Sequence, residues 1–284
     1  MESLQFFKDY TLKTIRNPEL YQGKVDAMYM CGKVPLERIR MVYFDIETSP
    51  QSCTNRPNVS ADTIIEIAGV DINDATFSEL CNPGHDIYNS EIHGISNKDV
   101  MSARPTRDVL LDFLTWVRDS DHDVVMLIGH NASNFDSKVL QAHIKRYDIE
   151  QKLYQNIVIG DTLYPAKKLS GCLSGSLENI FKHMFDANYI EEHRALQDSI
   201  DLKRIMSELA LRGKTTVYSL LHDYIYSLSL PDIKKQNRVY LSVPYDMKDD
   251  AKSKGAKWDK EKRLWYSESD KTHALLIATY TKVT

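Results

Sequence analysis

The chain has 284 residues, of which 42% are hydrophobic and 27% are charged, and its formal net charge is −4. These values are ordinary for a soluble globular protein, and the length favours one domain plus a smaller one. No apolar run approaches the roughly 18 residues that a membrane helix needs, so the composition excludes a membrane-spanning class and no membrane partner is expected.

The charge is unevenly distributed along the chain. Residues 234–284 carry 12 Lys and Arg and 7 Asp and Glu, a net of +5, whereas residues 1–233 carry 24 and 33, a net of −9. An acidic body with a short basic end predicts two modules. The expected divisions are an N-terminal extension over 1–40, a main domain over 41–213, a helical linker over 214–235 and a small basic module over 236–284.

The cysteines and the N-terminus bear on the cellular compartment. Cys31, Cys53, Cys81 and Cys172 lie far apart and form no CxxC pair, which argues against a zinc site. The first residues lack the basic region and the apolar core of a signal peptide. Both observations favour a reducing, intracellular compartment, either cytoplasmic or nuclear.

The first half of the chain is expected to be rich in strands. A short helix is expected within residues 1–22, followed by an irregular stretch over 23–40 where glycine and proline interrupt any period. Residues 41–48, 63–70 and 75–80 are β-branched and apolar, which predicts three strands. Their short connections favour an antiparallel meander.

The second half alternates helices and strands. Residues 124–129 form a continuous apolar run, typical of a central strand buried on both faces, and a shorter strand is expected at 157–159. The expected helical segments are 109–117, 135–144, 177–184, 195–212 and 215–233. Strands followed by alternating helices and strands predict an α/β domain with a mixed sheet, and a site at the carboxyl end of its first strand.

Two acidic residues, Asp45 and Glu47, end the first strand. Side chains alternate faces along a strand, so both carboxylates point the same way while Ile46 points into the core. Adjacent like charges repel unless a cation lies between them, and hard oxygen ligands suit Mg²⁺ or Mn²⁺. For this pair taken alone, a solvated strand end is the alternative.

Two later segments carry further candidates. Asp136 follows the strand at 124–129 and opens a helix, where the helix dipole alone would also favour an acid. His193 and Asp198 lie five residues apart, which would place them about 140° apart on one helix. They converge only if His193 lies in the loop before the helix. A surface histidine beside a helical acid is the alternative.

Taken together, these segments resemble one known family. Residues 44–48 (Phe-Asp-Ile-Glu-Thr), 130–136 (His-Asn-Ala-Ser-Asn-Phe-Asp) and 193–198 (His-Arg-Ala-Leu-Gln-Asp) look like the three motifs of the DEDDh 3′→5′ exonucleases. That family has a ribonuclease-H-like fold and includes the proofreading subunit of bacterial DNA polymerase III. The likeness covers about residues 40–210.

The resemblance implies roles for five residues. Asp45, Glu47, Asp136 and Asp198 would bind two divalent ions, Mg²⁺ or Mn²⁺, and His193 would be the general base. Two cations stabilise the attacking and leaving oxygens of an in-line phosphoryl displacement, and a histidine that titrates near neutrality can take the proton of the attacking water. The implied activity is hydrolysis of DNA or RNA from the 3′ end to nucleoside 5′-monophosphates.

The resemblance also implies contacts with the substrate. Thr48 is expected to meet the terminal nucleotide, and His130 and Asn131 are expected to line the scissile phosphate. His93 either touches the terminal base or shapes a turn. Whether the nucleic acid is DNA or RNA is not readable, because that discrimination rests on contacts near the sugar 2′ position.

The basic end shows a strand, short helix, turn and strand pattern over 238–266. Residues 255–259 (Gly-Ala-Lys-Trp-Asp), followed by Trp265, resemble a small module of unassigned function found beside primase-like domains, often in phage, plasmid and large-virus proteins. Its lysines and tryptophans would suit a nucleic-acid surface. The alternative, which we expect, is that Trp258 and Trp265 form the core of this small α+β domain, since so small a domain needs its large aromatics inside.

Two other functions stay open at this point. The chain could be a proofreading subunit that works only when bound to a polymerase in replication or repair, and this would require another chain because no polymerase motif is present. It could instead be a nucleic-acid-binding protein with a catalytically weak nuclease fold. The presence of all five catalytic residue types speaks against the second alternative.

Overall fold

The computed structural model describes residues 18–52, 58–59, 61–119, 121–228, 239–259, 262–267, 276 and 279–282, with side chains from residue 23 to residue 281. The chain divides into two compact units. The larger spans Leu20–Ser229, and the smaller combines Leu230–Thr284 with Met1–Glu19. Most of the helix expected within residues 1–22 lies outside the described residues.

In its described part, the larger unit holds a seven-stranded sheet in the order β4-β3-β2-β1-β5-β6-β7. The strands are β1 (Ile39–Ser49), β2 (Thr63–Asp71), β3 (Thr76–Asn82), β4 (Arg104–Pro105), β5 (Val124–Gly129), β6 (Ile157–Asp161) and β7 (Ile225–Ser227). Antiparallel pairing of β1 with β2 and of β2 with β3 confirms the expected meander. β5 pairs in parallel with both β1 and β6, so the mixed sheet is confirmed as well.

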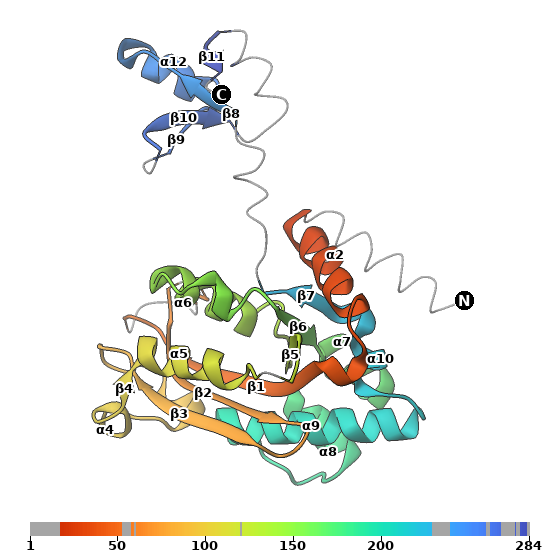
Figure 1. Ribbon diagram of the computed structural model, residues 1–284. Coiled ribbons are helices and arrows are strands. Elements are labelled where there is room, and N and C mark those ends of the chain that lie inside the picture. Colours follow the sequence, from red (N-terminus) through yellow and green to blue (C-terminus); the bar gives the residue numbers. More distant parts are fainter. Residues whose placement is uncertain are drawn as a thin grey trace. The chain divides into compact units, whose positions relative to one another are not determined.

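Helices cover both faces of this sheet (Figure 1). They include α3 (Ser90–His93), α4 (Asn97–Val100), α5 (Thr106–Trp116), α6 (Asp136–Arg146), α7 (Leu163–Ser170), α8 (Leu177–Met184) and α9 (Ala195–Arg212). One face packs on α5 and α6 and buries Phe44 with Leu110, while the other packs on α8 and α9 and buries Tyr43 with Ile205. Even-numbered residues of central β1 therefore face α5, and odd-numbered residues face α9.

The N-terminal boundary of the larger unit differs from expectation. Within residues 23–40, expected to be irregular, the chain forms most of helix α2 (Pro18–Gly32) and the short 3₁₀ helix η1 (Leu36–Arg38). Ala27 and Cys31 of α2 are buried in the same core cluster as residues of α9. The helix was missed because its stabilisation comes from this tertiary packing, not from a clear amphipathic period.

The C-terminal boundary differs too. Residues 214–235, expected to be a helical linker, contain α10 (Val217–Leu221), the 3₁₀ helix η3 (His222–Tyr224) and strand β7, which pairs antiparallel with β6. Leu221 and Ile225 join the same core as α2, and the Lys24 ammonium group donates to the Asp223 carbonyl oxygen at 2.8 Å. The domain is therefore longer at both ends than its sequence motifs indicate.

The smaller unit, in its described part, holds a four-stranded sheet in the order β11-β8-β10-β9 and a short helix, α12 (Lys248–Ser253). Its strands are β8 (Val239–Ser242), β9 (Lys257–Asp259), β10 (Leu264–Ser267) and β11 (Thr281–Lys282). The buried core contains Leu241, Ala251 and Trp265. Trp258 is 46% exposed, so only one of the two tryptophans that we expected in the core lies there.

Two further expectations concern compartment. Cys31, Cys81 and Cys172 are free thiols, and Cys53 lies outside the described residues. None of the helices in the described ranges combines the length and the apolar character needed to cross a bilayer.

Candidate active site

Asp45 and Glu47 lie at the carboxyl-terminal part of β1 on the face that α9 covers. The opposite-facing neighbours Phe44 and Ile46 are buried among the residues of α5 and α6, which fixes the direction of the two acids. The register between β1 and β2 shifts between Glu47 and Thr48. Such a bulge re-aims side chains locally, and here it falls at the end of the acidic pair.

Asp136 reaches the same end of the sheet from the first turn of α6, which follows β5 after a tight loop. A Cβ at Gly129 would lie 2.8 Å from the Cβ of Ala132, so glycine is needed for the loop to fold back on the strand. Asn131 adopts a left-handed φ of 59° in this loop. Asp161 at the end of β6 accepts hydrogen bonds from the backbone and hydroxyl of Ser133, which ties the loop to the neighbouring strand.

His193 and Asp198 come from the start of α9. The helix begins at Ala195, and the Asp198 amide donates to the Arg194 carbonyl oxygen at 3.0 Å, so Asp198 lies in its first turn. His193 lies outside the helix with a left-handed φ of 49°, a sparsely populated conformation for a residue other than glycine. This placement resolves the angular problem, because the two side chains need not share a helical face.

These residues meet. One ligand atom each from Glu47, His193 and Asp198 lie within 4.8 Å of one another. The charge of Asp136 raises the pKa of Asp45, and both of these acids raise the pKa of Glu47. Asp45 also raises the pKa of Asp198, so Asp45 and Asp136 lie beside the other acids. Five side chains from β1, α6 and the start of α9 therefore converge on the carboxyl end of β1.

Without a cation, this site strongly disfavours the charged form of its carboxyl groups. Burial, and then the charge of neighbouring carboxylates, raises the pKa of Glu47 to about 10 and that of Asp198 to about 9. Burial raises the pKa of Asp136 to about 7, and the pKa of Asp45 lies well above its usual range for the same first cause. Acids placed so closely without a cation would hold protons at neutral pH.

The donor set fits a divalent cation. Within the described residues, Oδ1 of Asp136 and Oδ1 of Asp198 are buried and have no hydrogen-bond partner. An unpaired buried carboxylate oxygen is costly, and coordination of a hard cation would satisfy it. Asp45, Glu47, Asp136 and Asp198 supply the oxygen ligands that Mg²⁺ and Mn²⁺ prefer.

Sequence reasoning missed Glu66 and Arg194. Glu66 lies on β2 directly opposite Glu47 in the register and is 2% exposed. Its carboxylate accepts from Arg194 Nη2 at 2.6 Å, from Arg194 Nε at 3.1 Å and from the Ala195 amide at 3.0 Å. Arg194 and Ala195 lie inside the third motif, so the sequence did point to this segment. Their partner Glu66 lies 128 residues from Arg194 on another strand, and only the fold shows that they are neighbours.

Glu191 was also missed. It is half-buried two residues before His193, and its charge helps to raise the pKa values of Asp45 and Asp198. Burial raises the pKa of Glu191 itself, while His193 lowers it. Two further acids, Glu66 and Glu191, therefore border the four that the motifs supply.

The four residues expected to contact substrate lie in different surroundings. Thr48 is 7% exposed, and its carbonyl accepts from Asn89 Nδ2 at 2.9 Å. Both ring nitrogens of His130 are engaged, with the Thr162 hydroxyl at 3.0 Å and the Gly175 carbonyl at 2.6 Å. These contacts assign His130 to holding the loop, and they do not favour direct phosphate binding.

Asn131 and His93 complete that group. The Asn131 side-chain oxygen accepts from Asn134 Nδ2 at 2.8 Å. His93 is 1% exposed, and its Nδ1 accepts from the Ile95 amide at 3.1 Å. The neutral ring therefore carries its proton on Nε2, which is buried and has no partner among the described residues. The charges of Glu66, Arg194 and His193 all act on His93, so the ring lies beside the acidic cluster.

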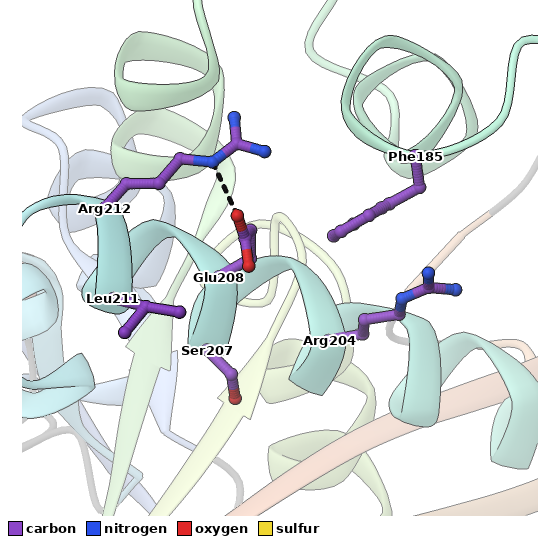
Figure 2. Close-up of a pocket in the computed structure, with 6 residues that line it drawn as sticks. All are labelled: Phe185, Arg204, Ser207, Glu208, Leu211 and Arg212. Atoms are coloured by element: carbon purple, nitrogen blue, oxygen red, sulfur yellow. Dashed lines mark hydrogen bonds and ion pairs between the residues drawn. The ribbon is translucent and has the colours of Figure 1, made fainter.

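A surface pocket lies elsewhere on α9 (Figure 2). It is lined by Phe185, Arg204, Ser207, Glu208, Leu211 and Arg212. Arg212 Nε pairs with Glu208 at 2.7 Å, and the Arg204 guanidinium lies 4.3 Å from the Phe185 ring centroid. Arg212 and Glu208 thus satisfy each other, Arg204 lies against an aromatic ring, and the distance along the helix from Asp198 separates this pocket from the acidic site.

The central strand of the mixed sheet and the first turns of two helices bring a cluster of acids together. This arrangement defines the ribonuclease-H-like nuclease class. Residues 42–206 match the family described as "Exonuclease", so the chain belongs to the exonuclease family. The resemblance to the DEDDh 3′→5′ exonucleases is therefore confirmed. Residues 238–277 match a domain of unknown function, DUF5710. The expected link of this module to primase-like domains stays a prediction.

Curated relatives include DNA polymerase III PolC-type of Streptococcus pneumoniae, 28% identical over 235 residues that cover 80% of this chain and 15% of the polymerase. The Streptococcus pyogenes serotype M1 protein of the same name is 28% identical over 181 residues, covering 62% of this chain and 12% of that one. The chain thus spans about 15% or less of the length of these relatives.

Solved structures share the fold. A 3′-exonuclease in a structure of histone mRNA stem-loop recognition matches with a TM-score of 0.50 and 15% identity, over 65% of this chain and 69% of its own. Escherichia coli Exonuclease I in complex with a dA16 oligonucleotide matches with a TM-score of 0.52 and 14% identity, over 72% of this chain and 48% of its own. The predicted ribonuclease-H-like architecture is therefore confirmed.

Proposed function

We propose that this protein hydrolyses nucleic acid from its 3′ end and releases nucleoside 5′-monophosphates. The observation that carries the proposal is the convergence of Glu47, His193 and Asp198 within 4.8 Å, next to Asp45 and Asp136. The structural neighbours support a nucleic-acid substrate, since one is described with a histone mRNA stem-loop and another with a dA16 oligonucleotide.

Each residue of the chain has a distinct task in this scheme. Asp45, Glu47, Asp136 and Asp198 would hold two divalent ions, Mg²⁺ or Mn²⁺, and these ions would supply the positive charge that stabilises the attacking and leaving oxygens of an in-line displacement. His193 accepts the proton of the attacking water as the new P–O bond forms. The bond from phosphorus to the 3′ oxygen then breaks, and that oxygen leaves on the shortened strand.

The position of His193 suits a general base. The residue is exposed, so water can reach it, while Glu47 and Asp198 beside it are half-buried and buried. A nearby carboxylate stabilises the imidazolium that forms when the proton is accepted. The left-handed backbone at His193 holds the ring out of the helix and toward the acids.

His93 is our candidate for a substrate contact. Its buried Nε2–H has no partner among the described residues, lies beside the acidic cluster and can donate a hydrogen bond to the terminal nucleotide. Thr48, His130 and Asn131 stay predictions of substrate contact, with His130 the least supported because both of its ring nitrogens already have protein partners.

The deciding experiment follows 5′-labelled single- and double-stranded DNA and RNA with Mg²⁺, Mn²⁺ or a chelator. We expect a ladder of products shortened from the 3′ end, release of 5′-monophosphates, and no cleavage with chelator. Internal cleavage, or digestion without divalent ions, would contradict the proposal.

A second candidate role is proofreading in association with a polymerase. It is favoured by the similarity to PolC-type DNA polymerase III, in which the matching segment is part of a much longer chain. A polymerase partner would raise exonuclease activity on a mismatched 3′ end above that of the isolated protein. Equal activity on matched and mismatched ends, with and without polymerase, would remove this role.

A further inference from the structure

Arg194 is held by a buried acid on one side and faces solvent on the other. It follows His193, the proposed general base, and is the last residue before α9. Its guanidinium donates to the Glu66 carboxylate from Nη2 at 2.6 Å and from Nε at 3.1 Å. The side chain of Glu66 is 3% exposed, whereas that of Arg194 is 45% exposed. The buried partner therefore fixes the direction of a cation that stays open to solvent.

The contact with Glu66 occupies one edge of the guanidinium. An arginine carries five N–H donors in a rigid plane. Nε and Nη2 donate to Glu66, and Nη1 has no hydrogen-bond partner among the described residues. The end of the fork formed by Nη1 and the second N–H of Nη2 is thus available to another oxyanion. Two parallel N–H donors are the arrangement by which arginine binds a phosphate.

Arg194 lies next to both the acidic cluster and His93. Its partner Glu66 is opposite Glu47 in the strand register. The hydrogen bond to Glu66 raises the pKa of Arg194, and the charge of Glu47 adds to this effect. Burial lowers the pKa of His93, and the charge of Arg194 lowers it further. The guanidinium thus borders the acids and the histidine that we expect to contact the terminal nucleotide.

No second acid pairs with Arg194 in the described part of the chain. Asp99 is an electrostatic neighbour, but its Oδ2 accepts from the Ser96 amide at 2.8 Å and from the Ser96 hydroxyl at 2.6 Å, and it forms no ion pair with Arg194. A strand of phosphates that approaches so many acids needs a fixed cation, since phosphate contacts dominate the affinity of proteins for nucleic acid. A guanidinium supplies this charge because it is not deprotonated in proteins.

We propose that the free end of the Arg194 guanidinium binds a backbone phosphate of the strand being degraded, next to the scissile phosphate. Arg194 then has two tasks. One edge of the guanidinium holds the loop that carries His193, and the other end positions the strand against that histidine. The contact involves neither the base nor the sugar 2′ position, so it serves DNA and RNA alike. The inference rests on the proposed function, because it takes nucleic acid to be the substrate.

Breaking the pair from each side separates binding of the strand from support of the loop. Glu66→Gln removes the acid and keeps the guanidinium, whereas Glu66→Gln with Arg194→Gln leaves two neutral side chains that can still bond to each other. Anisotropy of a fluorescein-labelled dT or rU homopolymer gives the Kd of the full chain in chelator at several salt concentrations. We expect Glu66→Gln to leave the Kd unchanged or to lower it. Adding Arg194→Gln should raise the Kd about tenfold and reduce the slope of log Kd against log salt by about 0.7, the value for one phosphate contact on a single strand.

The matched control is Glu208→Gln, alone and with Arg212→Gln, at an exposed ion pair of 2.7 Å near the far end of α9. Both control variants should keep the wild-type Kd and salt slope. If Glu66→Gln weakens binding as much as the double variant does, or if the salt slope stays the same, Arg194 only supports the loop and the proposal is overturned. An equal loss in the control pair overturns it as well, because the effect is then one of net charge.

Two further measurements keep the outcome decisive. If the neutral pair unfolds in a thermal melt, Arg194→Met with Glu66→Gln takes its place. If binding in chelator is too weak to measure, the KM with Mg²⁺ gives the same comparison. Turnover of the wild type with Mg²⁺ is scored separately from binding. A chain that binds the strand through Arg194 and cleaves nothing would refute the proposed function and leave this contact standing.

Discussion

Arg194 and Glu66 join the loop that carries His193 to the strand beside Glu47. Two guanidinium nitrogens reach the Glu66 carboxylate, at 2.6 and 3.1 Å, and the Ala195 amide donates to it as well. Glu66 is opposite Glu47 on the neighbouring strand. One buried carboxylate thus fixes both the start of α9 and the position of the histidine relative to the acids.

This relationship predicts a separation of stability from activity. Arg194→Met leaves the Glu66 charge buried and unpaired, so we expect it to lower the free energy of unfolding by about 2–3 kcal/mol and to lower kcat. Adding Glu66→Gln should recover most of the stability but not kcat, because His193 is still no longer held. Thermal melts and nucleotide release check this, and full recovery of kcat in the double variant would contradict it. Arg194→Lys, which keeps the charge without the fork, should lie between.

The predicted roles of Asp45 and His193 are tested by removing them one at a time. His193→Ala should lower kcat by about 10²–10⁴-fold, the usual contribution of a general base, with little change in melting temperature because the residue is exposed. Asp45→Asn should abolish most turnover. His122→Ala, at a surface site paired with Asp119, is the control. Undiminished cleavage by either variant would refute the role assigned to that residue.

The raised pKa values of the acids predict how stability depends on pH when metal is absent. The folded protein keeps protons on Glu47 and Asp198 up to about pH 10 and 9, whereas the unfolded chain releases them near pH 4. The unfolded state then binds fewer protons, so stability should fall as pH rises between these limits. Melting temperatures in chelator from pH 5 to 9 measure the slope.

Asp198→Asn provides the comparison that cancels other titrating groups. We expect it to flatten the pH slope of the metal-free protein, and we expect Mg²⁺ to raise the melting temperature of the wild type more at high pH than at low pH. Parallel slopes for the wild type and the variant, with no effect of Mg²⁺, would show that the acids are not coupled to a cation.

His93 should affect binding more than chemistry. His93→Asn shortens the side chain and withdraws the Nε2–H from its buried position, so the KM for a single-stranded substrate should rise while kcat changes little. His85→Asn is a matched control at a half-exposed histidine, whose Nε2 lies 3.1 Å from the Thr63 hydroxyl oxygen. A fall in kcat at unchanged KM would instead make His93 part of the catalytic arrangement.

Much of the fold could be predicted because the central strands have clear apolar or β-branched sequence patterns. The apolar run at 124–129 and the β-branched run at 63–70 needed no tertiary information, and the start of α9 followed from the requirement that His193 and Asp198 converge. Two of the segments that were not predicted, α2 and β7, are held mainly by packing against the rest of the domain. Local pattern carries little of that information.

The site divides in the same way. Asp45, Glu47, Asp136, His193 and Asp198 lie in three short motifs, each readable in one stretch of sequence. Glu66 and Glu191 lie in no such motif, and their importance depends on a neighbour across a strand pair or around a loop. Trp258 was assigned to the core because its size favours burial, and its place on an edge strand decided otherwise.

The contact of α2 with Leu221, Asp223 and Ile225 has a practical consequence for dissecting the protein. A fragment cut at residue 213, where the motif-bearing segment ends, would strip β6 of its outer neighbour and expose a row of backbone groups ready to pair with another molecule. A fragment begun at residue 41 would lose the helix that shields the same region. A well-behaved nuclease fragment must therefore run from about residue 18 to residue 228.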